Sequence, residues 1–319
     1  MSNPWFERRE ECPACASGRF KIIYQGQYDE PPVEDYLVDF YSPQGRVEFE
    51  YLNEMAYVLC ECDVCGLIFQ RDIPNESLME KLYEQWIDPQ KALSRHQEQD
   101  DLEYYSNHAQ EIMQIISYFR KEPSSLCFFD FGMGWGEWAL MAKAFGCNSY
   151  GTELSSERIE YAKSNGIKVI RWDEIPQHRF DFINTEQVFE HIPEPLRTLL
   201  HLKTALKTDG ILKIGVPHAN DIKRRLKIMD WKAPKGSKNS LNPVAPLEHI
   251  NCFRRTSLLK MASEAEMEEV LIPLTVQYKH ITNWSGPKRF AKNILLPLYR
   301  NLLKKQSHIF LRNIRQNKD

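Results

Sequence analysis

The stretch Phe128-Phe129-Asp130-Phe131-Gly132-Met133-Gly134-Trp135-Gly136 decides the fold class of this chain. It begins as an apolar strand and becomes a glycine-rich turn, after which residues 137–145 have the pattern of a helix. Glycines let a backbone pass close to a ligand, and the free amide groups of a helix N-terminus bind polar atoms. Taken alone, the turn has two interpretations: a ligand-binding loop, or simply a tight connection between a strand and a helix.

The glycine spacing separates this turn from the dinucleotide-binding fingerprint G-x-G-x-x-G. Gly136 arrives one residue too early for that fingerprint. Asp130 stands two residues before Gly132, where a carboxylate suits an amino group better than a pyrophosphate. The spacing therefore favours a ligand that presents an amino group.

Strands and helices alternate on both sides of the turn. Such alternation predicts an α/β fold with a mostly parallel, doubly wound, Rossmann-like sheet. We expect strands at residues 46–51, 56–60, 126–131, 149–153, 167–172, 180–184, 211–216 and 270–273, and helices at 102–119, 137–145, 157–164, 195–206 and 256–265.

A chain of 319 residues is long enough for about two domains. The first 70 residues are rich in Cys, Tyr and turn residues, which predicts a small β module. We expect this module at 1–70, a helical linker at 71–101, the α/β domain at 102–283 with an insertion at about 217–247, and a basic amphipathic tail at 284–319.

Two Cys-x-x-Cys turns predict a metal site in the N-terminal module. They are Cys12-Pro-Ala-Cys15 and Cys62-Asp-Val-Cys65. Two thiolates at this spacing point inward from one turn, and two such turns complete a tetrahedral shell of four sulfurs for Zn²⁺. A closed shell predicts a structural, zinc-ribbon-like site. Cys60 is an alternative ligand, iron also accepts four thiolates, and unliganded cysteines are the remaining interpretation.

Further polar motifs follow the glycine turn along the chain. Glu153 and Leu154 end the second strand, and Asp173 and Glu174 follow the third. The fourth strand leads into Glu186-Gln187-Val188-Phe189-Glu190-His191-Ile192-Pro193. Later, Glu248-His249-Ile250-Asn251-Cys252-Phe253 precedes the helix expected at 256–265.

In this order, the motifs resemble the class I S-adenosylmethionine-dependent methyltransferase family, over about residues 102–275. The resemblance implies S-adenosylmethionine as the methyl donor. It also implies that Glu153 holds the ribose hydroxyls, which suits a carboxylate facing two adjacent donors, and that Asp173 and Glu174 contact adenine. The full implied cofactor-binding set is Asp130, Gly132, Gly134, Gly136, Glu153, Leu154, Asp173, Glu174 and Glu186.

Methyl transfer mainly requires that the acceptor be aligned and that water be excluded. An oxygen acceptor also benefits from a general base, a role that histidine fills near neutral pH. His249 is the first candidate and His191 the second, with Glu190 orienting a histidine or the donor. Two alternatives remain: the Glu190–His191 pair caps the helix that follows it, and His249 is a packed core histidine.

The Glu190-His191-Ile192 motif resembles the small-molecule and sugar-modifying branch of the family. It implies a sugar, a nucleotide sugar or a lipid-linked saccharide as the acceptor. An rRNA methyltransferase with a zinc finger is an alternative, supported by the basic run at 223–227, and a non-catalytic binding protein of the same fold is another. Nucleic acid is disfavoured because the expected zinc module and the linker after it are acidic and would repel phosphates; residues 1–212 as a whole carry 20 Lys and Arg against 36 Asp and Glu.

The C-terminal third is basic, with 21 Lys and Arg against 8 Asp and Glu in residues 213–319. Its tail predicts an amphipathic helix that lies on an anionic membrane, or else packs on the edge of the sheet. Neither a signal peptide nor an apolar stretch of about 20 residues is found, so we expect a cytoplasmic location with peripheral contact at the inner membrane face. The apolar side of the expected tail helix comprises Leu295, Leu298, Leu302, Leu303, Phe310 and Ile314.

Overall fold

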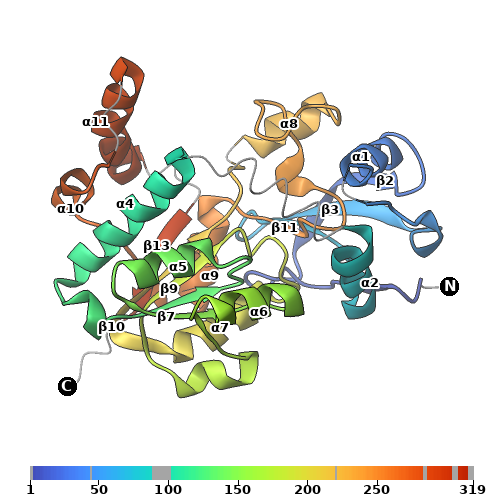
Figure 1. Cartoon of the computed structure of the whole chain (residues 1–319). Coiled ribbons are helices and arrows are strands. Elements are labelled where there is room, and N and C mark those ends of the chain that lie inside the picture. Colours follow the sequence, from blue (N-terminus) through green and yellow to red (C-terminus); the bar gives the residue numbers. More distant parts are fainter. Residues whose placement is uncertain are drawn as a thin grey trace. The chain divides into compact units, whose positions relative to one another are not determined.

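The computed structural model describes residues 3–43, 45–87, 102–219, 221–282, 286–303 and 308–314. The chain forms two compact units, and each is assembled from separate stretches of sequence (Figure 1). We call the first the N-terminal unit and the second the sheet unit. The N-terminal unit comprises Met1–Asp100, Glu190–Pro195 and Pro217–Lys260, and the sheet unit comprises Asp101–Phe189, Leu196–Val216 and Met261–Asp319.

The sheet unit contains a sheet of seven strands in the order β12-β13-β10-β9-β6-β7-β8. Strands β10, β9, β6, β7 and β8 run parallel, and β13 runs antiparallel to both of its neighbours. The predicted α/β fold with a mostly parallel sheet is thus confirmed. The strands are β6 (Cys127–Phe131), β7 (Asn148–Thr152), β8 (Lys168–Val169), β9 (Phe180–Glu186), β10 (Leu206–Gly215), β12 (Met267–Val270) and β13 (His308–Asn313).

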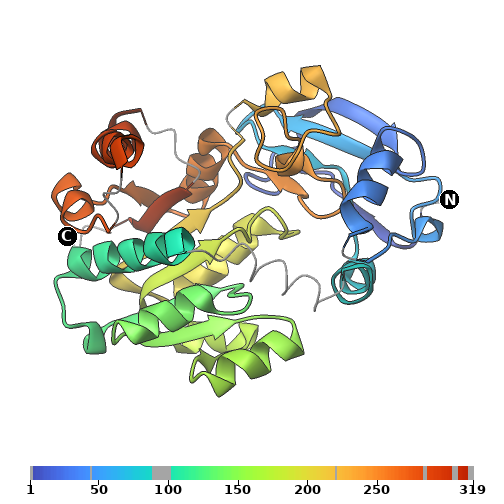
Figure 2. The ribbon, with the colours of Figure 1, turned by 45° about the horizontal axis from the view of Figure 1, so that its top comes forward.

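Helices cover the sheet because a connection between parallel strands crosses over its face. Phe128, Phe182 and Trp138 share one aromatic core with helices α4 and α5, which Figure 2 shows side by side. The consecutive Phe128 and Phe129 are both fully buried, as expected for a strand covered on both faces. The helices are α4 (Leu102–Phe119), α5 (Glu137–Ala144), α6 (Ser156–Ser164), α7 (Pro195–Thr204), α9 (Arg255–Glu264), α10 (Leu274–Lys279) and α11 (Gly286–Leu303).

The tail is not one continuous helix, so this part of the prediction is wrong. Only α11 is helical, and β13 enters the sheet between β10 and β12. Leu311 pairs with Leu212, and Phe310 is buried. The physical reason is that an open edge of β10 would leave a row of backbone donors and acceptors unpaired. Predicted tail residues 284–285, 304–307 and 315–319 lie outside the described residues, as do the side chains of Leu302 and Leu303.

Three other predicted strands differ from the structure. Residues 46–51 form no strand; the 3-10 helix η1 (Phe49–Tyr51) lies there. The strand expected at 167–172 is shortened to β8, because the 3-10 helix η4 (Trp172–Gln177) begins at its end. The strand expected at 270–273 is β12, which ends at Val270. In each case apolar residues at strand spacing pack in irregular structure, which periodicity alone does not separate from a strand.

The N-terminal unit contains an antiparallel sheet in the order β11-β4-β3-β2 and a separate pair, β1 with β5. Its core is unusually aromatic and includes Tyr28, Tyr41, Tyr57, Trp86 and Trp231. Its elements are β1 (Phe6–Arg8), β2 (Phe20–Gln27), α1 (Val33–Tyr41), β3 (Ala56–Cys62), β4 (Ile68–Gln70), β5 (Asp72–Pro74), α2 (Glu76–Lys81), the π-helical turn η2 (Leu82–Trp86), α8 (Ile222–Ile228), η5 (Asn242–Val244) and β11 (Asn251–Cys252).

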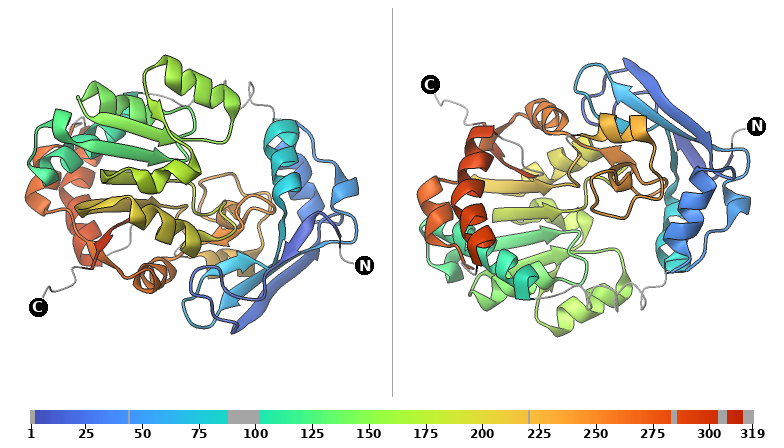
Figure 3. Two further views of the ribbon diagram at one scale, coloured as in Figure 1. Left: turned by 90° about the horizontal axis from the view of Figure 1, so that it is seen from below. Right: turned by 90° about the horizontal axis from the view of Figure 1, so that it is seen from above.

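The stretch expected as an insertion in the α/β domain packs within the N-terminal unit. Strand β11 pairs with β4, which brings segments far apart in sequence together (Figure 3). The buried side chain of Gln70 donates hydrogen bonds to the carbonyl oxygens of Ala245 (3.0 Å) and His249 (3.2 Å). Residues 217–260 therefore complete the N-terminal unit's core. The expected helical linker is wrong in part: residues 72–74 form β5, which pairs with β1, and Leu78, Leu82 and Trp86 of α2 and η2 pack in the N-terminal unit's core. Residues 88–101 lie outside the described residues.

Candidate functional site

The glycine turn has the geometry of a ligand-binding loop. Gly132, Gly134 and Gly136 all have positive φ angles, of 70°, 57° and 81°. A Cβ at Gly132 would lie 2.8 Å from a methyl of Val188, whereas a Cβ at Gly134 would meet no atom of the described residues within 4 Å. Side chains other than glycine's are strained at such φ values. The positive φ at Gly134 therefore favours glycine, and the described residues leave space beside its Cα.

Glu153 joins the glycine turn to the start of α6. Its carboxylate accepts hydrogen bonds from the backbone N–H of Gly134 (2.9 Å), Leu154 (2.9 Å) and Ser155 (3.2 Å). Arg158 Nη1 lies 3.9 Å from the same carboxylate. These contacts fix the position of Glu153 beside the turn, where its remaining lone pairs can accept from a ligand. Leu154 is 99% exposed, so none of the described parts of the chain covers it.

Asp130 and Asn184 form a buried polar pair on the neighbouring strands β6 and β9. Asn184 Nδ2 donates to Asp130 Oδ1 at 2.8 Å. Burial raises the pKa of Asp130 to about 7, although this hydrogen bond acts in the opposite direction. Asn184 Oδ1 is buried and has no hydrogen-bond partner among the described residues. A buried acceptor without a donor is costly, so a ligand N–H group would satisfy it.

Asp173 and Glu174 lie in η4, where both interact with Arg171. Arg171 is 2.9 Å from Asp173 Oδ2 and 3.2 Å from Glu174 Oε1, and its backbone N–H donates to Glu174 Oε2 (2.8 Å). Trp172, beside them, is 44% exposed and stacks on His201 at a centroid distance of 3.9 Å. The two acids therefore shape the loop, and the exposed indole is the apolar surface that it presents.

Glu186 contacts a buried lysine that the sequence analysis did not single out. Lys213 Nζ lies 2.7 Å from Glu186 Oε2 and 2.7 Å from Glu111 Oε2. Trp138 Nε1 also donates to Glu111 (3.1 Å). Burial opposes the charge on Lys213, but the two carboxylates outweigh it and hold the lysine pKa above its usual range. A lysine within the otherwise apolar run Ile211–Val216 was the available sequence signal.

Glu190, His191 and His249 come together within the N-terminal unit. One ligand atom from each lies within 4.8 Å of the others, and the two imidazole centroids are 4.9 Å apart. Burial lowers the pKa of His191 to about 4 and that of His249 to about 3, so both rings are neutral at pH 7. The structure thus brings the three predicted catalytic residues into one cluster.

The helix-capping interpretation of the Glu190–His191 pair is wrong. Helix α7 begins at Pro195, four residues after His191. His191 Nδ1 instead lies 3.0 Å from the carbonyl oxygen of Glu248 and 3.1 Å from the hydroxyl of Tyr83. His191 is therefore held by tertiary contacts within the N-terminal unit.

The four cysteines of the two Cys-x-x-Cys turns also form a cluster. Cys12 Sγ is 3.5 Å from Cys65 Sγ, Cys15 Sγ is 3.6 Å from Cys62 Sγ, and all four sulfurs lie within 4.8 Å of one another. A tetrahedral shell with Zn–S bonds of about 2.3 Å would separate its sulfurs by about 3.8 Å. The donor set and its spacing therefore fit Zn²⁺. Cys60 does not belong to this cluster.

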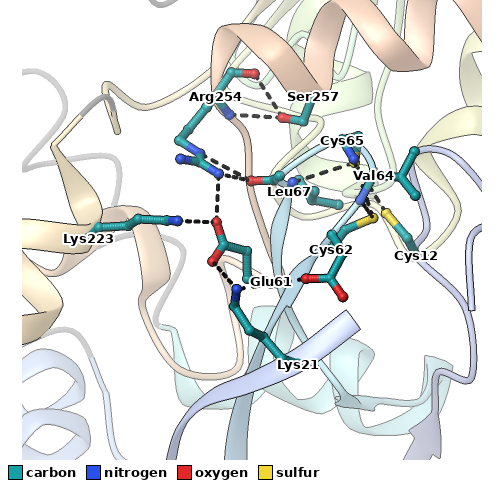
Figure 4. Close-up of polar contacts among 12 residues, drawn as sticks. Cys12, Lys21, Glu61, Cys62, Val64, Cys65, Leu67, Lys223, Arg254 and Ser257 are labelled. Carbon is teal, nitrogen blue, oxygen red and sulfur yellow. Dashed lines mark hydrogen bonds and ion pairs between the residues drawn. The ribbon is translucent and has the colours of Figure 1, made fainter. Parts of the chain in front are cut away.

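Beside the cysteines, buried Glu61 gathers three cationic side chains (Figure 4). Lys223 lies 2.5 Å away, Arg254 2.9 Å and Lys21 3.8 Å. Burial acts to raise the pKa of Glu61, but the hydrogen bond from Lys223 and the other cations hold it below its usual range. Arg254 also donates to the carbonyl oxygen of Gly66, which follows the second cysteine turn. Sequence reasoning missed this cluster because its members come from distant parts of the chain; Glu61 and Arg254 alone are 193 residues apart.

The basic run at 223–227 is largely neutralised by such pairs. Besides the Lys223–Glu61 contact, Arg224 and Arg225 lie 2.9 and 2.6 Å from Asp221. Arg225 is buried. This pairing disfavours a phosphate-binding role for the run.

Residues 103–270 match a family of methyltransferase domains, and this segment is just over half of the chain. The chain belongs to that methyltransferase family. The match confirms the prediction of an S-adenosylmethionine-dependent methyltransferase domain. None of the curated proteins compared with the chain matches it.

Several solved methyltransferase structures are similar at low identity. PKMT2 from Rickettsia typhi, in complex with AdoHcy, is 14% identical with a TM-score of 0.40, covering 66% of this chain and 54% of its own. The plantazolicin methyltransferase BpumL has 15% identity, a TM-score of 0.48 and coverages of 75% and 94%. A TehB-like methyltransferase from Corynebacterium glutamicum is 17% identical with a TM-score of 0.37, and the match covers 61% of this chain and 86% of the TehB-like chain. The chain spans about half the length of the PKMT2 chain, and similarity at this level says nothing about the acceptor.

Proposed function

We propose that this methyltransferase transfers a methyl group from S-adenosylmethionine to an oxygen atom of a small molecule. A sugar, a nucleotide sugar or a lipid-linked saccharide is the first acceptor class to test. The assignment of S-adenosylmethionine as the donor is supported by the glycine turn, which is hydrogen-bonded to Glu153 inside the matched domain. The acceptor half rests on the cluster of Glu190, His191 and His249.

The residues of the sheet unit fit the donor. When bound, S-adenosylmethionine supplies a methyl group already activated on a sulfonium sulfur. The positive-φ backbone of the glycine turn lets a ligand approach, and Glu153 accepts from ribose hydroxyls. Asn184 Oδ1, which lacks a donor among the described residues, accepts from the amino group of the donor. The indole of Trp172 offers its exposed face to a base.

The histidine cluster suits an acceptor hydroxyl. His249 Nδ1 contacts the carbonyl oxygen of Asn242, and a carbonyl oxygen can only accept. This contact leaves the proton on Nδ1 and the lone pair on Nε2. A neutral imidazole with a free Nε2 is able to take a proton from a hydroxyl. His191 is in the same state by the same reasoning.

The donor assignment is tested by calorimetric titration of the full chain with S-adenosylhomocysteine. Glu153→Ala is expected to weaken binding by at least about 10-fold, since hydrogen bonds to a charged group contribute about 1.5–3 kcal/mol. Glu157→Ala, an exposed acid in the first turn of α6, is the matched control and should bind like the natural chain. Unchanged binding by Glu153→Ala would remove the assigned role, and no binding by the folded natural chain would remove the donor assignment.

We also propose that Cys12, Cys15, Cys62 and Cys65 hold a structural Zn²⁺. Backbone N–H groups support the sulfurs: Cys65 donates to Cys62 Sγ (3.5 Å) and Leu67 donates to Cys65 Sγ (3.4 Å). Such bonds stabilise thiolates, the form that binds metal. Four protein ligands leave no open position, so the ion would stabilise the module and take no part in the reaction.

A peripheral membrane contact is a further proposal for helix α11. Its residues Phe290, Leu295 and Leu298 are 52%, 61% and 37% exposed. An exposed apolar row on a helix that also carries basic residues suits an anionic lipid surface. No helix among the described residues is long and apolar enough to cross a membrane.

A further inference from the structure

Two imidazoles and one carboxylate converge in the N-terminal unit, separate from the four cysteines. Glu190 and His191 are consecutive, and His249 comes from a segment 58 residues later. Their ligand atoms lie within 4.8 Å of one another, which is short enough for a single ion to contact all three. Glu190 and His249 are buried, and the His191 side chain is 26% exposed. The cluster therefore keeps one partly open side.

The surroundings set the tautomers of both rings. The carbonyl oxygen of Glu248 accepts from His191 Nδ1 (3.0 Å), and the carbonyl oxygen of Asn242 accepts from His249 Nδ1. With the protons held on Nδ1, each ring has its lone pair on Nε2. Metal-binding histidines usually have their second nitrogen fixed by a backbone carbonyl or carboxylate in this way. His191 Nε2 lies 3.8 Å from Glu190 Oε1, so the carboxylate is close to the free lone pair.

The two segments are also pinned to each other. Asn251 N–H donates to the carbonyl oxygen of Glu190 (3.0 Å), and its side chain donates to the carbonyl oxygen of Ile192 (2.7 Å). The buried carboxyl of Glu248 accepts from the hydroxyl of Tyr41 (2.9 Å). Ligands on rigid supports lose little conformational entropy when an ion binds. Both segments are therefore held in place by bonds outside the cluster.

The geometry points to a divalent transition-metal ion bound by Glu190 Oε, His191 Nε2 and His249 Nε2. Imidazole nitrogens with one carboxylate suit Zn²⁺, Fe²⁺, Mn²⁺ or Co²⁺. Three protein ligands leave at least one position open for an outside molecule. This site differs from the cysteine cluster, whose four thiolates close the shell and favour soft ions.

This inference rests on the proposed function for its acceptor, but it replaces the general base. With the ion bound, the Nε2 lone pairs of His191 and His249 are used for coordination, so neither ring takes the acceptor's proton. An acceptor hydroxyl bound at the open position would have its pKa lowered by the ion. The O–H bond then breaks with its electron pair left on oxygen, and the proton passes to solvent water. The acceptor oxygen becomes the nucleophile at neutral pH. A pair of vicinal hydroxyls, as in a sugar, would suit two adjacent open positions.

The test uses the full chain with its cysteine site loaded with zinc. Dialysis against a weak chelator lowers the zinc content to one equivalent, and the protein is then titrated with Mn²⁺ while electron paramagnetic resonance counts the free ion. Thiolates bind Mn²⁺ poorly, so the cysteine site does not contribute. We expect one equivalent of bound Mn²⁺. A parallel titration with Co²⁺, read by its absorption, covers a preference for a softer ion.

Variants connect the binding to the three ligands. Glu190→Gln and His249→Ala are each expected to weaken Mn²⁺ binding by at least about 100-fold. Altering a residue that only supports a ligand already costs about 10–100-fold in metal affinity, and these variants remove ligands themselves. His201→Ala, which removes a histidine of the sheet unit, is the matched control and should bind normally. Circular dichroism checks folding, and Glu190→Gln, which preserves the side-chain shape, serves if His249→Ala does not fold. The site is overturned if the natural chain binds neither ion, or if Glu190→Gln binds like the natural chain. Because the readout is metal binding, failure here leaves the donor titration with S-adenosylhomocysteine unaffected.

Discussion

Replacing Lys213 by Met should destabilise the sheet unit in a pH-dependent manner. The Lys213 side chain is 6% exposed and lies between the carboxylates of Glu111 and Glu186. Removing one member of a buried ion pair costs about 3–5 kcal/mol, because the other charge stays buried without a partner. Glu111 is 22% and Glu186 40% exposed, so water partly solvates both, and we expect the lower end, about 3 kcal/mol. This loss corresponds to a fall in Tm of roughly 6–12 °C.

The sign of the pH dependence follows from Glu111. Burial acts to raise its pKa, but the attraction of Lys213 outweighs burial and holds the pKa below its usual range. In the natural chain the ionised Glu111 paired with Lys213 stabilises the fold at neutral pH, and this stabilisation is lost as the pH falls through that lowered pKa. Without Lys213, burial is opposed only by the hydrogen bond from Trp138 and the nearby His108, so we expect the pKa of Glu111 to rise. The penalty is then absent at acid pH, where the carboxyl is protonated, and grows as the pH rises through the raised pKa.

Urea denaturation of the full chain between pH 4.5 and 8, followed by circular dichroism and fluorescence, measures this effect. The double variant Lys213→Met/Glu111→Gln should recover much of the lost stability at pH 8, because it removes the more buried of the two carboxylates that Lys213 leaves unpaired. Lys163→Met, on the exposed surface of α6, is the control and should change little. A loss below about 1 kcal/mol for Lys213→Met, equal at both ends of the pH range, would refute the reasoning.

Three further outcomes can be measured. Gly132→Ala should lower the affinity for S-adenosylhomocysteine and cost about 1–2 kcal/mol of folding stability, since φ at this position is 70° and a Cβ would lie 2.8 Å from Val188. Calorimetry measures the affinity and urea denaturation measures the stability. An affinity equal to that of the natural chain contradicts the prediction. Cys65→Ser should lower the zinc content by one equivalent per chain, measured by mass spectrometry of the metal, whereas Cys60→Ser should retain it; equal zinc in both variants would exclude the proposed ligand set. Replacing the exposed apolar residues Phe290, Ile294, Leu295 and Leu298 of α11 by Ser should abolish flotation with anionic vesicles and leave the protein folded. Vesicle binding that persists, or that never occurs in the natural chain, ends the membrane proposal.

The α11 experiment uses point substitutions because of where the chain goes next. Strand β13 pairs on both sides, with β10 and with β12. A deletion of the whole tail would remove a strand from inside the sheet and leave two unpaired edges. Loss of vesicle binding would then report unfolding, whereas exposed side chains of α11 can be changed without touching the sheet.

The sequence by itself determined the elements whose signals are local. The apolar strand before the glycine turn, the amphipathic helix at 102–119 and the alternation of strands and helices along the chain all depend on residues close together in the chain. The two Cys-x-x-Cys turns are also local signals, and each predicts its own pair of inward thiols. The glycine spacing alone was enough to predict the turn, because a positive φ angle depends on the single residue that adopts it.

Tertiary structure alone decided the pairings between distant segments. Strand β13 carries only the short apolar run Ile309–Leu311 and resembled the end of a helix, yet the open edge of β10 makes it a strand. Residues 217–260 resembled an insertion, yet β11 and the buried Gln70 bind them to the N-terminal unit. The histidine cluster likewise depends on bringing His249 to Glu190 and His191. Periodicity reports which face of an element is buried, but not which partner buries it, because a buried surface gains the same free energy against any apolar neighbour that fits.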